Sequence, residues 1–256
     1  MAYSKTLPLF VLLTSVVSAT TARADDPAPK EIISKAIKAA GWDKSKGDFH
    51  AWKDVGKFNF QDMEFDYTAF WKVDVKTGRY RMDLKMEIGG QKIEIASIFN
   101  GERAFESMGD MKQDVTGEKL EYTKENGHQF RVISLKPLLT DEKFKLTSVP
   151  GKAVDGKETY AIKVEYPGRT AFTLSFEKSS GLCVKSEGMV PNEFEGWKKT
   201  LDESYFSDWK ETAVGGAKFF MTMKTVRNGK PLLVSKMSEV TISEKPDWAK
   251  TAFEKP

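Results

Sequence analysis

The sequence predicts a mainly β protein of the α+β class, in which one strongly curved antiparallel sheet surrounds a few helices. Three observations support this prediction. Residues 63–88 alternate between apolar and polar side chains, similar patterns return after residue 143, and only two segments have helical periodicity. Open twisted sheets rarely stay flat beyond about ten strands, and an apolar sheet face must be covered. We therefore expect the sheet to curve and to hold the helices in its concavity.

A long hairpin over residues 63–88 is the clearest single element. Apolar side chains occupy the odd positions from 63 to 75, and Phe70 is the one exception to the alternation. After a turn at residues 76–78 the apolar positions become even, from 80 to 88. Because side chains on a strand point alternately to opposite faces, this hairpin has one apolar face and one charged face.

Turn residues and periodicity predict the remaining elements. Residues 30–40 form a helix, with Pro29 near its start and Gly41 after its end. Residues 116–139 are also helical, and Asn126-Gly127 divides them into two pieces, of which Pro137 ends or kinks the second. With the hairpin, the expected strands number about ten or eleven: 52–61, 92–99 (which turns at 100–101 into 103–106), 143–149, 160–166, 172–176, 182–187, 205–211, 217–226 and 231–243. Residues 188–203 are expected to be irregular, and the tail 248–256 is expected to pack on the sheet through Trp248 and Phe253.

The first 24 residues have the features of a cleaved signal peptide. Lys5 precedes an apolar stretch at residues 7–19, and Ala22-Arg23-Ala24 matches the small-x-small cleavage pattern. The stretch is short for a membrane span, which needs about 20 residues, so an uncleaved anchor is the less favoured alternative. Cleavage after Ala24 leaves residues 25–256, which we interpret as one domain, exported to the periplasm or secreted.

Cys183 is the single cysteine of the chain, and it lies far from the expected cleavage site. A bacterial lipoprotein carries its lipid on a cysteine at that site, so we expect no lipid anchor. One cysteine also excludes an internal disulfide. Leu182 and Val184 flank Cys183 in an expected strand, which indicates structural filler rather than a nucleophile.

The composition offers little for catalysis, metal binding or nucleic-acid binding. The formal net charge is +3, and the opposite charges are interspersed without a basic block. His50 and His128 are the two histidines, too few with one cysteine for a zinc site, and we interpret both as ordinary surface or capping residues. Nucleophile-elbow, Walker and dinucleotide motifs do not occur in the sequence. We therefore expect a protein that is not an enzyme, binds no cofactor or metal, and is a monomer.

The apolar face of the sheet has two interpretations, because a packed core and a cavity wall produce the same alternation. Its residues either form a core beneath the helices or line a cavity that holds acyl chains. The candidate cavity-wall residues are Phe65, Tyr67, Trp71, Met82, Leu84, Met86, Ile93, Ile95, Phe172, Leu174, Met221 and Met223. The candidate lid residues, on the helical surfaces available to cover the sheet, are Ile32, Ile33, Ile37, Phe130, Ile133 and Leu138.

Three segments and the order of elements resemble the outer-membrane lipoprotein carrier (LolA) superfamily. The segments are 154–160 (Val-Asp-Gly-Lys-Glu-Thr-Tyr), 176–182 (Phe-Glu-Lys-Ser-Ser-Gly-Leu) and 205–211 (Tyr-Phe-Ser-Asp-Trp-Lys-Glu), and the closing residues 253–256 fit as well. Position 177 is Glu where the family often has Asp. No residue of this chain aligns with the functional arginine of the carriers, so none is assigned that role.

The resemblance implies a half-barrel of about eleven antiparallel strands with a helical lid over an apolar cavity. It also implies a soluble carrier that binds acyl chains of a lipid or lipoprotein and contacts envelope membrane proteins. Sorting of lipoproteins to the outer membrane is one role that the resemblance allows. Two alternatives remain open: an envelope sensor or scaffold whose cavity is filled by its own side chains, and a small-molecule enzyme that uses the cavity.

Overall fold

The computed structural model describes residues 26–45, 47–60, 63–212 and 216–255. The expected signal peptide, residues 1–24, and its cleavage site lie outside these ranges. None of the helices within them combines the length and the hydropathy that a membrane span requires.

Thirteen strands in the described ranges form one sheet, and every pair of neighbours is antiparallel. Their order from edge to edge is β6-β5-β4-β3-β2-β1-β13-β12-β11-β10-β9-β8-β7. The strands are β1 (Phe49–Phe60), β2 (Met63–Asp74), β3 (Arg79–Ile88), β4 (Gln91–Phe99), β5 (Ala104–Met108), β6 (Met111–Val115), β7 (Lys145–Val149), β8 (Thr159–Glu165), β9 (Phe172–Glu177), β10 (Cys183–Asn192), β11 (Lys198–Glu211), β12 (Lys218–Arg227) and β13 (Lys230–Ser243).

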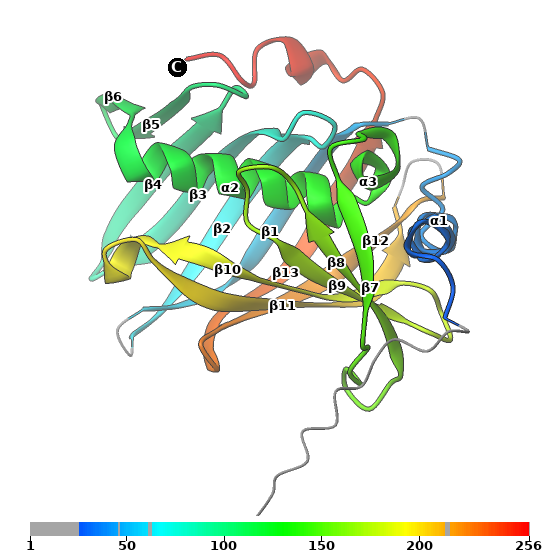
Figure 1. The fold of residues 1–256 in the computed structure, drawn as a ribbon. Coiled ribbons are helices and arrows are strands. Elements are labelled where there is room, and N and C mark those ends of the chain that lie inside the picture. Colours follow the sequence, from blue (N-terminus) through cyan, green and yellow to red (C-terminus); the bar gives the residue numbers. More distant parts are fainter. Residues whose placement is uncertain (1–25, 46, 61–62, 213–215, 256) are drawn as a thin grey trace, which may run out of the picture.

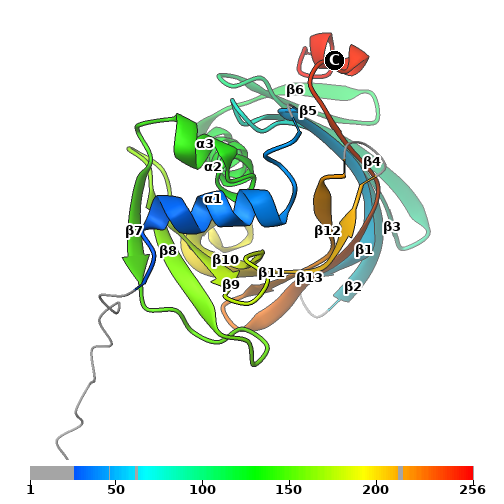
Figure 2. The same cartoon turned by 90° about the vertical axis from the view of Figure 1, so that its right-hand side faces the viewer.

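The sheet is an open half-barrel, because its edge strands β6 and β7 do not pair with each other. Figure 2 shows the sheet curving around three helices: α1 (Pro29–Ala39), α2 (Gly117–Ile133) and α3 (Lys136–Thr140). Two short 3₁₀ helices, η1 (Glu193–Glu195) and η2 (Asp247–Lys250), complete the described elements. The predicted fold class, a curved antiparallel sheet with helices on its concave side, is confirmed.

Two parts of the sheet differ from the sequence prediction. β6 was not expected, because Lys112, Gln113 and Asp114 are all polar and give no apolar alternation. These side chains are exposed, and β6 is an edge strand that pairs with β5 alone. The segment 188–203 is not irregular throughout: β10 continues to Asn192 and β11 begins at Lys198. Backbone pairing with a neighbour extends these strands where the side chains alone give no alternation.

Helix α1 forms as predicted from its apolar face. Ile32, Ile33 and Ile37 are buried on the side that faces the sheet. Gly41 ends the helix with a φ of +69°, and a Cβ at this position would lie 2.9 Å from the carbonyl oxygen of Gly216. Glycine meets both requirements, the left-handed backbone and the close approach.

Helix α2 runs without interruption across Asn126 and Gly127, so the predicted break at this dipeptide is wrong. A Cβ at Gly127 would lie 2.5 Å from the carbonyl oxygen of Gly78 and 3.0 Å from the ring of Phe99. This glycine therefore permits close packing of α2 on the β2–β3 turn rather than ending the helix. The helical segment breaks later, at Leu135, whose φ is +63°.

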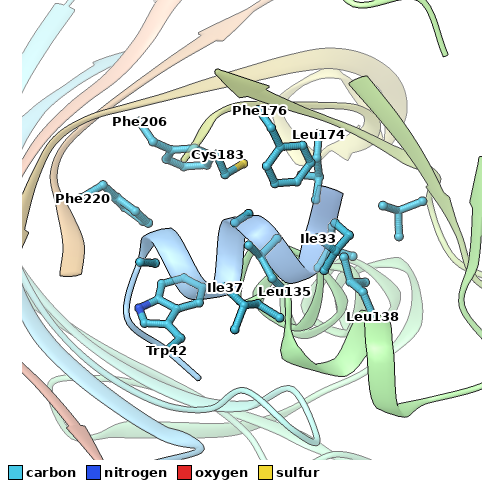
Figure 3. Packing of buried hydrophobic residues seen from close by; sticks show 14 of the residues in the cluster. Ile33, Ile37, Trp42, Leu135, Leu138, Leu174, Phe176, Cys183, Phe206 and Phe220 are labelled. Atoms are coloured by element: carbon cyan, nitrogen blue, oxygen red, sulfur yellow. The ribbon is translucent and has the colours of Figure 1, made fainter. Parts of the chain in front are cut away.

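The interior consists of two clusters of buried apolar side chains. The larger cluster joins α1 and α3 to strands β8–β13, and Figure 3 shows Ile33 and Ile37 of α1 among Leu135, Leu174 and Phe176. The smaller cluster lies under α2 and consists of Val73, Val75, Tyr80, Phe99, Ala104 and Val115. Helices on the concave face thus convert a large part of the curved sheet into packed core.

Both histidines are buried, which contradicts the prediction of surface or capping residues. His50 is 6% exposed, because the alternation of β1 turns its ring to the concave face beside Trp42. His128 is 4% exposed, lies 3.2 Å from the carbonyl oxygen of Thr170 through Nε2, and stacks on Phe144. Burial lowers the pKa of His50 to about 3 and that of His128 to about 4.

Two smaller predictions are confirmed. Cys183 is buried within the larger cluster, and burial raises the pKa of its thiol to about 12. The tail packs on the sheet: the ring of Trp248 lies 5.7 Å from that of Phe49, and Phe253 is buried beneath the guanidinium of Arg79.

Candidate functional site

Strand register arranges the concave side chains of β1–β4 in rows that run across the sheet. The first row, here called the Trp52 row, consists of Trp52, Trp71, Met82 and Ser97. The second, the Asp54 row, consists of Asp54, Ala69, Leu84 and Ile95, and it continues to Met108 and Met111. The third, the Tyr67 row, consists of Gly56, Tyr67, Met86 and Ile93, and Phe58 pairs with Phe65 beyond it.

Helix α2 covers Trp52 and Trp71 of the first row but leaves Met82 and the other two rows partly open. The ring of Phe130 lies 5.4 Å from that of Trp71, 6.0 Å from Trp52 and 5.5 Å from Tyr80, and Figure 1 shows α2 lying across the strands. Beyond this contact lies a surface that we name the apolar wall. Its half-buried side chains are Phe65, Met82, Leu84, Met86, Ile93 and Ile95. The concave face therefore changes from packed core to a partly exposed apolar surface.

A groove of ligand size and a small void both border helix α2. The groove has a volume of about 560 Å³. One side is formed by Leu120 and Glu121 in the first turns of α2, and the other by Pro191 near the end of β10 and Trp197 just before β11. Ligand pockets commonly measure about 300–1,000 Å³. The void, beneath Phe130, measures only about 20 Å³, which is room for about one water molecule.

The structure brings most of the sequence-predicted wall residues together. Those on β2–β4 lie side by side in the three rows, although Tyr67 is buried and Trp71 packs under α2. Met221 and Met223 of β12 are partly buried and pack against the larger cluster. Phe172 and Leu174 of β9 are fully buried in that cluster, away from the apolar wall. A ligand-binding role for any of these residues stays a prediction.

The predicted lid residues lie on the concave side but differ in exposure. Those of α1 and α3, namely Ile32, Ile33, Ile37 and Leu138, are buried in the larger cluster. Phe130 and Ile133 of α2 are half-buried and border the small void. Of the helices, α2 is therefore the one that adjoins the apolar wall, and movement of any helix stays a prediction.

Buried polar contacts hold α2 in place. The carboxylate of Glu125 accepts a hydrogen bond from the backbone N–H of Thr170 at 2.9 Å and pairs with Arg169 at 3.3 Å. Arg131, in the last turn of α2, pairs at 2.5 Å with Asp141, which follows α3. Because these partners belong to the segments around β8 and β9 and to the loop after α3, opening of α2 would require several of these bonds to break.

Asp54 is a polar group within the rows that the sequence prediction missed. It is 4% exposed, and its Oδ2 accepts a hydrogen bond from Nε1 of Trp71 at 3.2 Å. Burial raises the pKa of its carboxyl to about 6, although the neighbouring Tyr67 and Trp71 lower it. The signal was present in the sequence, because Asp54 occupies an inward position in the alternation Trp52, Asp54, Gly56, Phe58.

The described residues hold no group of three or more His, Cys, Asp or Glu side chains placed to bind a metal ion. The tyrosines, the cysteine and the histidines of the interior have pKa values shifted toward their neutral forms. Such groups are inert near neutral pH as nucleophiles and as charged acids or bases.

No protein-family model matches the chain, and no curated protein matches it. Among solved structures, the chain is similar to a LolA superfamily protein from Nitrosomonas europaea, with a TM-score of 0.57, 13% identity, and coverage of 90% of this chain and 99% of the other. A DUF1329 family protein from Desulfovibrio piger gives a TM-score of 0.55 at 12% identity, covering 90% and 100%. A protein domain from Vibrio parahaemolyticus, named for outer-membrane lipoprotein sorting, gives 0.54 at 11%, covering 88% and 99%. The chain has a LolA-like fold.

Proposed function

We propose that this protein is an exported carrier that binds an acyl chain of a lipid or lipoprotein on the apolar wall and performs no covalent chemistry. One observation carries the proposal: six apolar side chains of adjacent strands stay half-buried on the concave face, beside a helix that covers the rest. A contiguous apolar surface of this kind marks a binding site more often than scattered apolar residues do.

Burial of the acyl chain supplies the binding free energy. Each methylene group removed from water contributes about 0.8 kcal/mol. Met82 and Met86 are flexible and polarisable, so the wall can adapt to chains that differ in length and curvature. Opening of α2 against its bonds to Thr170 and Arg169 would enlarge access and allow release.

Export and partners belong to the same proposal. The first 24 residues have the pattern of a cleaved signal peptide, and the chain has no cysteine at the cleavage site to carry a lipid anchor. The proposed carrier works in the periplasm or outside the cell, and it works as a monomer. Envelope membrane proteins would load and unload it.

Binding of a fluorescent fatty acid to delipidated protein tests the proposal. Leu84→Trp, in the middle of the wall, should weaken binding by at least about tenfold, because the added indole excludes two or more methylene groups. Val55→Trp is the matched control, since Val55 lies on β1 one residue from Asp54 and points to the convex face. Absence of binding to the wild type, or equal loss in both variants, would contradict the proposal.

An envelope sensor or scaffold with a self-filled cavity is the second candidate. The small void under α2 supports it, because only about 20 Å³ is left empty there. Native mass spectrometry of protein purified from its own envelope separates the two candidates. A co-purified lipid would support the carrier, and its absence together with no fatty-acid binding would support the scaffold.

A further inference from the structure

The groove at the start of α2 combines an aromatic ring with carboxylates. Among the described residues, its lining consists of Gly117, Glu118, Leu120, Glu121, Pro191 and Trp197. Both charged residues of this lining are acidic, and its aromatic residue is a tryptophan. The face of an indole attracts cations, and carboxylates pair with them. The groove therefore has the chemistry of a site for a positively charged group.

Glu118 is the carboxylate of the lining whose charge is not compensated. Glu121 pairs with Lys124 at 2.6 Å and with Arg169 at 3.3 Å. Glu118 is exposed and has no ion pair in the part of the chain that the structure describes. One added cation would therefore neutralise the lining of the groove.

The surroundings of the groove do not supply this cation. Lys119, next to Glu118, pairs instead with Glu106 at 2.7 Å. The two lysines that follow Trp197 are balanced by the two glutamates of η1, which precede it. The first turn of α2 would by itself favour an anion because of the helix dipole, but Glu118 already places a negative charge there.

Trp197 is held in place by a tightly bonded turn, residues 193–197, which we name the η1 turn. The φ of Trp197 is +66°, a left-handed conformation that bulky residues rarely adopt. Its N–H donates to the carbonyl oxygen of Asn192 at 2.8 Å, and its ring lies 5.9 Å from that of Tyr122. The buried side chain of Asn192 accepts a hydrogen bond from Nη1 of Arg227 at 3.1 Å. The indole is thus positioned before a ligand arrives, which lowers the entropic cost of binding.

The η1 turn also reaches the apolar wall. The ring of Phe194, in this turn, lies 6.4 Å from the ring of Phe58 on β1. Phe58 pairs across the strands with Phe65, which belongs to the wall. The same turn therefore contacts the end of the wall and, through Trp197, lines the groove beside α2 (Figure 1).

We propose that the groove binds the ammonium head group of a lipid whose acyl chain lies on the apolar wall. The ammonium group lies over the indole of Trp197 and pairs with Glu118. This inference rests on the proposed function, because it names the head-group class of the lipid that the wall binds. A basic peptide would carry the same charge, but the contact between the η1 turn and the end of the wall favours the lipid.

Two matched lipids test the head-group site: 1-myristoyl-lysophosphatidylethanolamine and 1-myristoyl-lysophosphatidylglycerol, which has the same chain and phosphate but no ammonium group. Isothermal titration calorimetry measures the binding of each lipid, kept monomeric, to the delipidated wild-type protein. We expect the ethanolamine lipid to bind about tenfold more tightly, the ratio that a cation–π contact and an exposed ion pair together supply. Glu118→Gln should reduce this ratio to about threefold. Trp197→Asn should reduce it similarly, and asparagine tolerates the left-handed backbone at this position.

The matched control is Glu31→Gln, which removes an exposed carboxylate from the first turn of α1 and should leave the ratio unchanged. Equal affinity of the wild type for the two lipids, or tighter binding of the glycerol lipid, would overturn the head-group site and leave the wall intact. Failure of the wild type to bind either lipid would overturn the proposed function, and the inference with it. A lysine-rich peptide that binds the wild type but not Glu118→Gln, while the two lipids bind equally, would assign the groove to a protein partner instead.

A second measurement keeps the inference falsifiable if a variant does not fold. The indole N–H resonance of Trp197 in the wild-type protein should shift on addition of the ethanolamine lipid and should not shift with the glycerol lipid. Equal shifts with both lipids, or none with either while both bind, would overturn the head-group site.

Discussion

Replacing Asp54 with Asn tests whether burial of this carboxyl destabilises the fold, because the effect must depend on pH. Burial raises the folded-state pKa to about 6, above the ordinary value of 3.8. A raised carboxyl pKa means that the native protein holds its proton more tightly than the unfolded chain does. The resulting destabilisation is complete above pH 6 and disappears as the pH falls from about 6 through 3.8. Asn carries no charge at any pH and lacks this dependence.

The magnitude follows from the two pKa values. Ionisation of Asp54 destabilises the wild type by about 3 kcal/mol at pH 7.5 and by about 1 kcal/mol at pH 4.5. The free energy of unfolding of Asp54→Asn, relative to wild type, should therefore rise by about 2 kcal/mol between pH 4.5 and 7.5. The buried amide of Asn has an unpaired donor of its own, which lowers the variant's stability equally at both pH values.

Urea denaturation at the two pH values, followed by tryptophan fluorescence, measures this difference. Trp52 and Trp71 stack at 5.7 Å in the adjacent row, so they report on the same region. The buried histidines titrate in both proteins, and their contributions cancel in the comparison. Asp43→Asn, at an exposed position after α1, is the control and should stay within about 0.5 kcal/mol of wild type at both pH values. A difference for Asp54→Asn that does not change with pH would refute the reasoning.

Three further predictions concern the packed part of the structure. His128→Phe should reduce the loss of stability on acidification. The pKa of His128 is lowered to about 4 in the folded protein, so the unfolded chain binds the imidazole proton first, between about pH 6.5 and 4. Urea midpoints at pH 7 and 4.5 measure the effect, and the same fall in midpoint for wild type and variant would contradict it. Cys183 should not react with a thiol reagent at pH 8 until the protein unfolds, since the thiol is buried and its pKa is raised to about 12. Rapid reaction of the native protein would contradict this burial. Gly56→Ala should lower the free energy of unfolding by more than about 2 kcal/mol, because the new Cβ would lie 2.0 Å from the carbonyl oxygen of Val234. Gly168→Ala is the comparison variant: its Cβ meets no neighbour but its φ is +70°, so it should lose only the roughly 1 kcal/mol of a left-handed backbone, and an equal loss in urea denaturation of both variants would contradict the packing argument.

Local patterns predicted the elements whose side chains repeat with a clear period. The hairpin of β2 and β3 has its expected bounds within two residues, and α1 ends at Gly41 as its sequence indicates. Prediction failed where pairing or packing with distant residues decides the structure. β6 exists because it pairs with β5, and α2 passes through Gly127 because this glycine packs on Gly78. Neither partner can be identified from the residues around the element itself.

The candidate site divides in the same way. The sequence alone determined that one face of the sheet is apolar, because side-chain alternation on a strand is a local property of the backbone. It could not separate Leu174, buried in the packed core, from Leu84 on the apolar wall, since both occupy inward positions of alternating strands. Only the tertiary structure decided this, because the curvature of thirteen strands and the length of α2 determine which rows a helix covers. The burial of His50, His128 and Asp54 has the same origin: exposure depends on elements that lie far away in the chain.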